Sequence, residues 1–115
     1  LSAKNIALIK LEENSIDSSN SKILSTYIRE ALPKTTKIVI DLSNLEFMDS
    51  SFLNMLLELY REVVDAAGEL RVVATNPIIL SLFQLVYFNR IVEVYSNVAN
   101  AVDKPFREEK LGRWA

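Results

Sequence analysis

The sequence predicts an α/β domain built on four strands, with a fifth if residues before position 6 add an edge strand. Four short apolar runs rich in β-branched residues are typical of strands, and they are residues 6–11, 37–42, 70–74 and 91–95. Segments with helical periodicity lie between these runs, and strands that alternate with helices indicate α/β layering. The 115 residues, half of them apolar, are enough to fill one core.

The first strand, residues 6–11, carries apolar residues on both faces. Residues 12–21 are polar and rich in turn and cap formers, so they are expected to form a loop that ends at a helix start. One apolar helix face then follows, consisting of Ile23, Leu24, Tyr27, Ile28, Ala31 and Leu32. Pro33 ends this helix, because the residue before a proline is driven out of the helical region.

The second strand, residues 37–42, has a β-branched centre that predicts burial on both faces. The helix expected over residues 52–67 has an apolar arc wider than one sheet face needs, so a further element should cover part of it. Gly68 is one of only two glycines, and it is expected to end the helix in a left-handed conformation. Residues 70–74 form the third strand.

The last third of the sequence predicts two helices around the fourth strand. Pro77 suits the first turn of a helix over residues 78–86. Residues 91–95 form the last strand, and Ser96 is expected to cap a final helix over residues 97–102.

These elements define one domain over residues 1–102, followed by a charged C-terminal tail, residues 103–115. Phe106 and Trp114 are isolated aromatic residues in this tail and define no element, so disorder or loose packing is expected there, with a docking helix as the alternative. No apolar run approaches the roughly 20 residues that span a bilayer, and the first residues lack the layout of a signal peptide. We therefore expect a cytoplasmic protein that does not insert into membranes.

The composition disfavours several classes of function. The formal net charge is −2, with acidic and basic residues interspersed, so there is no basic stripe for nucleic acid and no polybasic segment for anionic lipid. Cysteine and histidine are both absent, which excludes thiolate sites and disfavours zinc chemistry and hydrolytic triads. No metal and no cofactor are expected.

The sequence also lacks the patterns of small enzymes. Gly68 and Gly112 are too far apart for a phosphate-binding loop or a dinucleotide fingerprint. The carboxylates of Asp17, Asp41 and Asp49 have no spacing that defines an acid and base pair. The sequence therefore contains no catalytic pattern, and the chain is not expected to be an enzyme.

The cluster Asp49-Ser50-Ser51 lies where the central strand leads into the longest predicted helix. A serine at a helix start has an ordinary role, because its hydroxyl caps free backbone N–H groups and contributes about 0.5–2 kcal/mol relative to alanine. Asp49 can take that role instead, which leaves Ser50 available. Phe47 and Met48, just before the cluster, are expected to pack beneath the turn.

The run Ile-Val-Ile-Asp-Leu-Ser-Asn-Leu-Glu-Phe-Met-Asp-Ser-Ser, residues 38–51, leads into a leucine-rich helix that ends at Gly68. This pattern resembles the core motif of the STAS domain in bacterial anti-sigma factor antagonists. The resemblance covers about residues 6–102, and Phe-Met-Asp-Ser-Ser is its most specific part. It implies a STAS-like α/β fold: a mixed four- or five-stranded sheet with helices packed mainly on one face.

In that family, the serine after the Asp is phosphorylated by a serine kinase that is also the anti-sigma factor. A metal-dependent serine phosphatase reverses the modification. The resemblance assigns the phosphorylated position to Ser50, with the neighbouring Ser51 as the alternative, and it gives Asp17 and Asp41 as further family positions. It implies an anti-sigma factor antagonist that sequesters the kinase while Ser50 is unphosphorylated.

Residues around Ser50 are expected to contact the partner, namely Asp17, Asp49, Ser51, Phe52 and Asn54. Many family members have small residues, often Gly, where this chain has Phe52 and Asn54, so the surface should be bulkier here. Phe52 has two interpretations: an aromatic anchor for the partner, or a core residue beneath the helix.

Two other functions stay open on the sequence. The same fold can serve as an interaction module in a stress-signalling scaffold or a transport system. A small enzyme that uses carboxylates or a bound nucleotide is the alternative from a different class.

Overall fold

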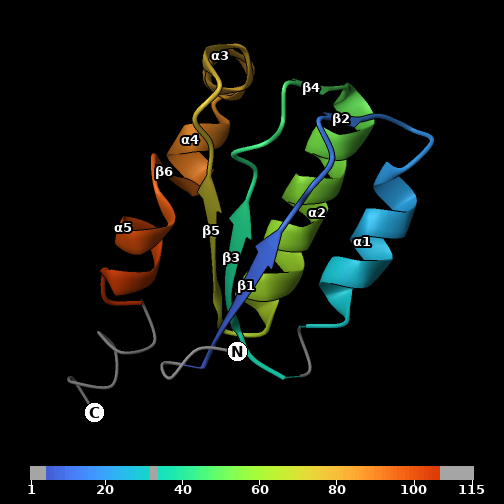
Figure 1. The fold of residues 1–115 in the computed structure, drawn as a ribbon. Coiled ribbons are helices and arrows are strands. Elements are labelled where there is room, and N and C mark those ends of the chain that lie inside the picture. Colours follow the sequence, from blue (N-terminus) through green and yellow to red (C-terminus); the bar gives the residue numbers. More distant parts are fainter. Residues whose placement is uncertain (1–4, 32–33, 107–115) are drawn as a thin grey trace.

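The computed structural model describes residues 5–31 and 34–106 (Figure 1). The elements in chain order are β1 (Ile6–Lys10), β2 (Ser15–Ile16), α1 (Ser21–Arg29), β3 (Lys37–Asp41), β4 (Phe47–Met48), α2 (Ser50–Asp65), β5 (Glu69–Val73), α3 (Pro77–Leu85), α4 (Phe88–Ile91), β6 (Glu93–Tyr95) and α5 (Val98–Asp103). Within these residues, every helix is too short or too polar to cross a bilayer.

The main sheet has four strands in the order β1-β3-β5-β6, and β2 pairs with β4 in a separate two-stranded sheet. The predicted α/β class and the number of strands are confirmed. A mixed sheet was expected, whereas all pairings among the described residues are parallel. The reason is that each connection between sheet neighbours passes through a helix, which returns the chain to the edge where the previous strand began.

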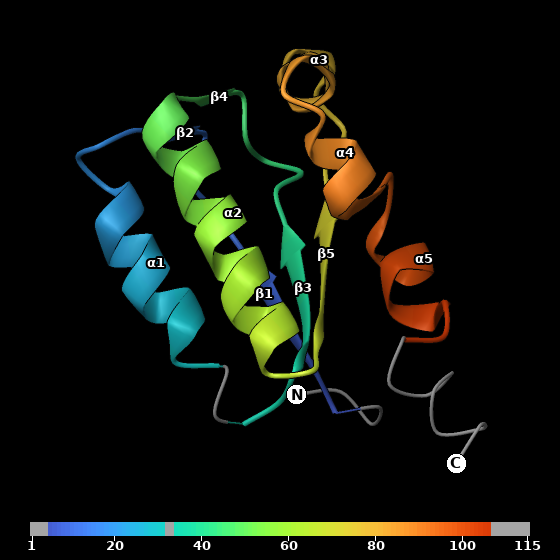
Figure 2. The ribbon, with the colours of Figure 1, turned by 180° about the vertical axis from the view of Figure 1, so that it is seen from behind.

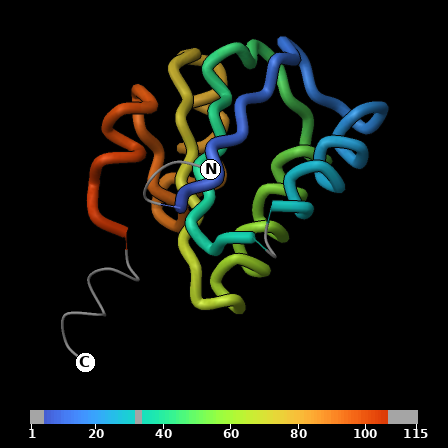
Figure 3. The backbone as a smooth tube through the Cα atoms, turned by 60° about the horizontal axis from the view of Figure 1, so that its bottom comes forward, coloured from blue at the N-terminus to red at the C-terminus, as the bar shows by residue number. Residues whose placement is uncertain are grey.

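The helices are distributed unequally over the two faces of the sheet. Figures 2 and 3 show α1 and α2 together on one face and α5 on the other. Helices α3 and α4 contribute Ile79, Phe83 and Phe88 to the same core as α2. The expected arrangement, with helices mainly on one face, is therefore confirmed.

The central strand β3 is buried on both faces, as its β-branched centre predicts. Ile38 and Ile40 point into the main core beneath α2, where they join Leu56. Val39 points to the opposite face and packs in a smaller core beneath α5. This burial holds β3, and hence the start of α2 that follows it, in a fixed position.

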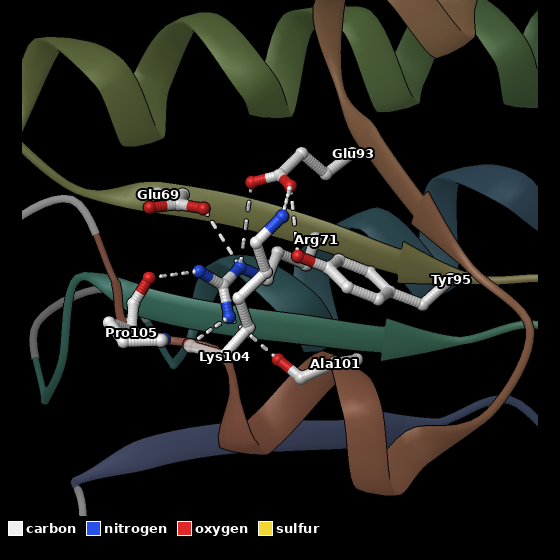
Figure 4. Close-up of polar contacts among 7 residues, drawn as sticks. All are labelled: Glu69, Arg71, Glu93, Tyr95, Ala101, Lys104 and Pro105. Carbon is white, nitrogen blue, oxygen red and sulfur yellow. Dashed lines mark hydrogen bonds and ion pairs between the residues drawn. The ribbon is translucent and has the colours of Figure 1, made fainter.

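The smaller core is closed by a fully buried arginine on β5 (Figure 4). The guanidinium of Arg71 donates hydrogen bonds to three backbone carbonyl oxygens, those of Ala101 at 2.9 Å, Lys104 at 2.6 Å and Pro105 at 2.7 Å. Its Nε donates to the Glu69 carboxylate at 2.8 Å, and its Cζ lies 3.6 Å from the centre of the Phe106 ring. The tail expected to be loose is therefore packed as far as Phe106, which is 1% exposed. The rest of the tail, including Trp114, lies outside the described residues.

The end of α2 differs from the sequence prediction. Ala67, with φ of 61°, is the left-handed residue, whereas Gly68 has no positive φ. Gly68 is required for a different reason: a Cβ there would overlap the carbonyl oxygen of Thr36 and lie 2.6 Å from the Thr36 Cβ. The glycine permits a close backbone approach between the end of α2 and the loop before β3.

The last elements also differ in detail from the prediction. Strand β6 is shorter than residues 91–95, because the chain first forms the short helix α4. Helix α5 is capped by Asn97, whose side chain accepts a hydrogen bond from the Asn100 N–H, and not by Ser96. Asparagine is among the preferred residues for this position.

Helix α1 is rotated relative to the predicted apolar face. Ile28 is buried as expected, but Ile23 is 72% exposed and Tyr27 is 65% exposed. Ser21 and Ser25 occupy buried positions instead, because α1 packs on the neighbouring α2. Leu24 and Ala31 of the predicted face are partly buried against the main core. Position 32, and Pro33, lie outside the described residues.

Candidate functional site

The candidate site lies at the carboxyl-terminal edge of the parallel sheet, where Asp49 ends the loop from β3 and α2 begins. Asp49 caps α2: its Oδ1 accepts hydrogen bonds from the N–H of Ser51 at 3.0 Å and from that of Phe52 at 3.3 Å. The sequence allowed either Ser50 or Asp49 as the N-cap of α2, and in the structure Asp49 is the N-cap. Ser50, the first residue of α2, therefore does not act as the cap.

Ser50 and Ser51 differ sharply in their surroundings. Ser50 is exposed, and its hydroxyl makes no hydrogen bond to any other described residue. The Ser51 hydroxyl donates to Asp49 Oδ1 at 2.5 Å, lies 3.4 Å from the Ser21 hydroxyl, and is partly buried. An incoming reagent therefore reaches the Ser50 oxygen freely, whereas the Ser51 hydroxyl is already engaged.

The two-stranded sheet brings the loop of Asp17 to this helix start. Strand β2 pairs in parallel with β4, and the Asp49 N–H donates to the Ile16 carbonyl at 3.1 Å. One residue after Asp17, the Ser18 N–H donates to Asp49 Oδ2 at 3.2 Å. Residues about thirty positions apart in the sequence thus form one surface beside Ser50.

Both acidic side chains of this surface are held in the ionised form. Donation from the Ser51 hydroxyl is the largest effect and lowers the pKa of Asp49; desolvation opposes it, and the backbone N–H groups of Phe52, Ser51 and Ser18 lower the pKa further. The hydroxyl and the N–H of Ser19, at 2.5 and 2.8 Å, lower the pKa of Asp17, although desolvation and then the charge of Asp49 oppose this. The site is therefore negatively charged at neutral pH.

The other predicted positions differ in whether their side chains are buried or exposed. Phe52, for which partner contact and core packing were both open, is fully buried, so its side chain packs in the core and is not available to a partner. Asn54 is exposed one turn after Ser50 and remains on the accessible surface. Asp41 is buried at the end of β3, where its Oδ1 accepts from the Ser43 N–H at 3.0 Å, so it shapes the turn.

Sequence reasoning missed an apolar hollow next to Ser50. It has a volume of about 190 Å³ and is lined by Met48, Asp49, Ser50, Leu53, Leu82 and Val86. Met48 packs beneath the turn as expected, but Phe47 is 52% exposed. The walls come from β4, α2 and α3, and only the tertiary structure brings these elements together.

The part of the site that the structure describes contains no cluster of side chains for a metal ion. Among residues 5–31 and 34–106, no three acidic side chains are grouped so that they could hold a metal ion. What the arrangement presents is an exposed hydroxyl at the N-terminus of a sixteen-residue helix, flanked by two carboxylates and an apolar hollow.

Comparison with known proteins agrees with the resemblance in the sequence. The anti-sigma F factor antagonist of Paenibacillus polymyxa is 29% identical over 101 residues, which cover 86% of each chain. The anti-sigma factor antagonist from Mycobacterium paratuberculosis has the same fold, with a TM-score of 0.79 and 22% identity over 89% of this chain and 86% of that one.

A second solved structure is the phosphorylated form of SpoIIAA, a cell fate determinant of Bacillus, and the unphosphorylated form is also known. The phosphorylated form matches with a TM-score of 0.64 and 20% identity over 100% of this chain and 96% of that one. The sequence model of the STAS domain family matches residues 3–101. The chain belongs to the STAS domain family.

Proposed function

We propose that this chain is an anti-sigma factor antagonist that binds an anti-sigma factor serine kinase, and that phosphorylation of Ser50 switches the binding off. The observation that carries the proposal is the free, exposed hydroxyl of Ser50 beside a helix cap that Asp49 already provides. The name of the Paenibacillus polymyxa relative and the two forms of SpoIIAA support it. In this role the chain is a cytoplasmic binding protein and a substrate, without an enzymatic activity of its own.

The proposed switch acts on binding and leaves the fold intact. A phosphate adds about −1.5 to −2 charges, and at a helix N-terminus the macrodipole stabilises a negative charge by about 0.3–1 kcal/mol. Because Ser50 is exposed, its phosphate remains in water in the free protein. In a complex the same group would have to lose water beside the carboxylate of Asp49, which opposes binding.

The proposal includes a cycle of two partner enzymes. The kinase transfers the γ-phosphoryl group of ATP to the Ser50 oxygen: the new O–P bond forms as the bond between the γ-phosphorus and the β-phosphate oxygen breaks, ADP leaves, and the hydroxyl proton is released. A metal-dependent serine phosphatase hydrolyses the phosphoserine and restores the binding-competent form. Asp17, Asp49 and Asn54 are the accessible positions that we expect to contact the kinase.

Phosphosite mapping tests the assignment. The purified chain is incubated with ATP and the anti-sigma factor serine kinase of the source organism, and the phosphopeptides are fragmented so that Ser50 and Ser51 are distinguished. We expect phosphate on Ser50, its loss in Ser50→Ala and its retention in the matched variant Ser51→Ala. Phosphate on Ser51 of the wild type, or undiminished labelling of Ser50→Ala, would overturn the assignment.

A further inference from the structure

Helix α3 presents an outward face that is apolar and has no partner among the described residues. The helix contains no charged residue. Ile79 and Phe83 anchor its inner side in the core, whereas Ile78 is 62% exposed and Leu85 is 75% exposed. A surface helix normally carries polar residues on its outer side, so the apolar outer face of α3 is unusual for a helix exposed to solvent.

The exposed face is continuous with the site of Ser50. A groove of about 410 Å³ runs along it and is lined by Pro77, Ile78, Ser81, Leu82 and Leu85. Leu82 also lines the 190 Å³ hollow that Ser50 and Asp49 border, and Val86 lies in the wall of that hollow as well. We call Ile78, Leu82, Leu85 and Val86 the α3 face.

We propose that the α3 face is the docking surface on which the anti-sigma factor kinase packs apolar side chains, with Ser50 at its border. This inference rests on the proposed function. A stable protein interface takes about 800 Å² from each partner, which is more than the few polar side chains at the start of α2 supply. Because Ser50 lines the adjoining hollow, a partner that covers Ser50 is expected to cover the hollow as well.

The distribution of charge indicates the chemistry of the partner surface. Figures 1 and 2 show α3 on one side of β4 and β2 on the other. Asp17 directly follows β2 in the chain. The surface thus runs from an uncharged apolar end on α3 to an acidic end at Asp17 and Asp49. Its complement is an apolar patch flanked by lysine or arginine on the kinase.

This placement gives the phosphate a specific way to act. The hollow beside Ser50 has almost entirely apolar walls, so a partner side chain seated there excludes water from its mouth. A phosphate on Ser50 stands at that mouth, where an apolar partner side chain in the hollow supplies no counter-charge, so burying the phosphate there is costly. The α3 face is expected to contribute affinity, and Ser50 is expected to control it.

The test measures binding of the purified anti-sigma factor serine kinase of the source organism by calorimetry. Leu85→Ser and Ile78→Ser change exposed residues of the α3 face and should each weaken binding by roughly tenfold or more. The matched control is Ile91→Ser, because Ile91 is 47% exposed and borders a different hollow with Tyr60 and Val64 towards the other end of α2. The control should bind within about twofold of the wild type.

Ser50→Asp in the same series separates this inference from the proposed function. If Ser50→Asp loses binding while both α3 variants bind like the wild type, the docking surface is wrong and the switch stands. If the α3 variants lose binding while Ser50→Asp binds fully, the docking surface stands and the switch is wrong. Thermal unfolding of each variant confirms that it is folded.

Sedimentation of the free protein addresses another occupant. If the wild type dimerises and Leu85→Ser is monomeric, the α3 face is covered by a second copy of the chain, and the inference of a kinase surface is overturned. A monomeric wild type, together with weakened kinase binding of the α3 variants, supports it.

Discussion

Replacing Arg71 with methionine removes the side chain that fastens residues 101–106 to the sheet. Arg71 is 0% exposed, and Met fills part of its volume without supplying a donor. The three carbonyl oxygens that the guanidinium binds lose their partner, and each that stays buried costs about 1–3 kcal/mol. The Ala101 carbonyl belongs to a fully buried residue, and the Glu69 carboxylate loses its ion pair with Arg71. We expect a loss of about 3–5 kcal/mol, as for other broken buried ion pairs.

Urea denaturation followed by circular dichroism measures this loss. With a slope of about 1.5 kcal/mol/M, the unfolding midpoint of Arg71→Met should fall by about 2–3 M. The matched control is Arg61→Met, because Arg61 is exposed on α2 and forms no ion pair with the described residues. The control should stay within about 0.5 kcal/mol of the wild type. If Arg71→Met unfolds at the same urea concentration as the control, the buried arginine does not hold the C-terminal segment in place.

Three further predictions concern single contacts. Gly68→Ala should destabilise the protein by about 1–3 kcal/mol, because the new Cβ overlaps a backbone oxygen. Ala67→Gly should stabilise the protein by about 0.5–1 kcal/mol, because Ala67 has φ of 61°, a conformation that favours glycine. Urea midpoints that move in the opposite directions would contradict these predictions. Ser51→Ala should raise the pKa of Asp49 towards its ordinary value in a carboxyl-carbon NMR titration, and an unchanged value would contradict the Ser51 hydrogen bond. The stabilisation that this pKa shift provides should be complete above the ordinary carboxyl pKa and disappear as the pH falls through the lowered pKa. Burial and a hydrogen bond to a neighbouring carboxylate raise the pKa of Tyr95 to about 12, so the tyrosinate absorbance should show a transition near pH 12 that Tyr95→Phe lacks. The stabilisation of the folded protein that comes from the raised pKa of Tyr95 is complete below pH 10 and is lost as the pH rises through about 12.

The elements with a strong periodic pattern were predictable from the sequence. The buried centre of β3 and the long apolar helix α2 follow from local side-chain patterns, and so does the junction at which Asp49 caps the helix. The resemblance then placed Ser50 in a STAS domain, and the family assignment was confirmed. The role of Ser50 itself remains a prediction.

The features that depend on distant contacts were not predictable in this way. Strands β2 and β4 have two residues each, which is too short for a periodic pattern, and only the lone apolar Ile16 in a polar stretch hinted at them. The burial of Phe52 depends on how α2 is rotated against the sheet. The packing of Phe106 depends on Arg71, which lies thirty-five positions earlier in the chain. Because arginine is charged, nothing in the sequence indicated that Arg71 is buried on β5.

The affinity of the anti-sigma factor serine kinase for the unmodified chain, compared with the chain phosphorylated on Ser50, tests the central claim most directly. Exposure of Ser50 predicts that the urea midpoint hardly changes on phosphorylation, while the cost of desolvating the phosphate weakens binding by roughly a hundredfold or more. Equal affinities of the two forms would contradict the claim that phosphorylation of Ser50 releases the kinase.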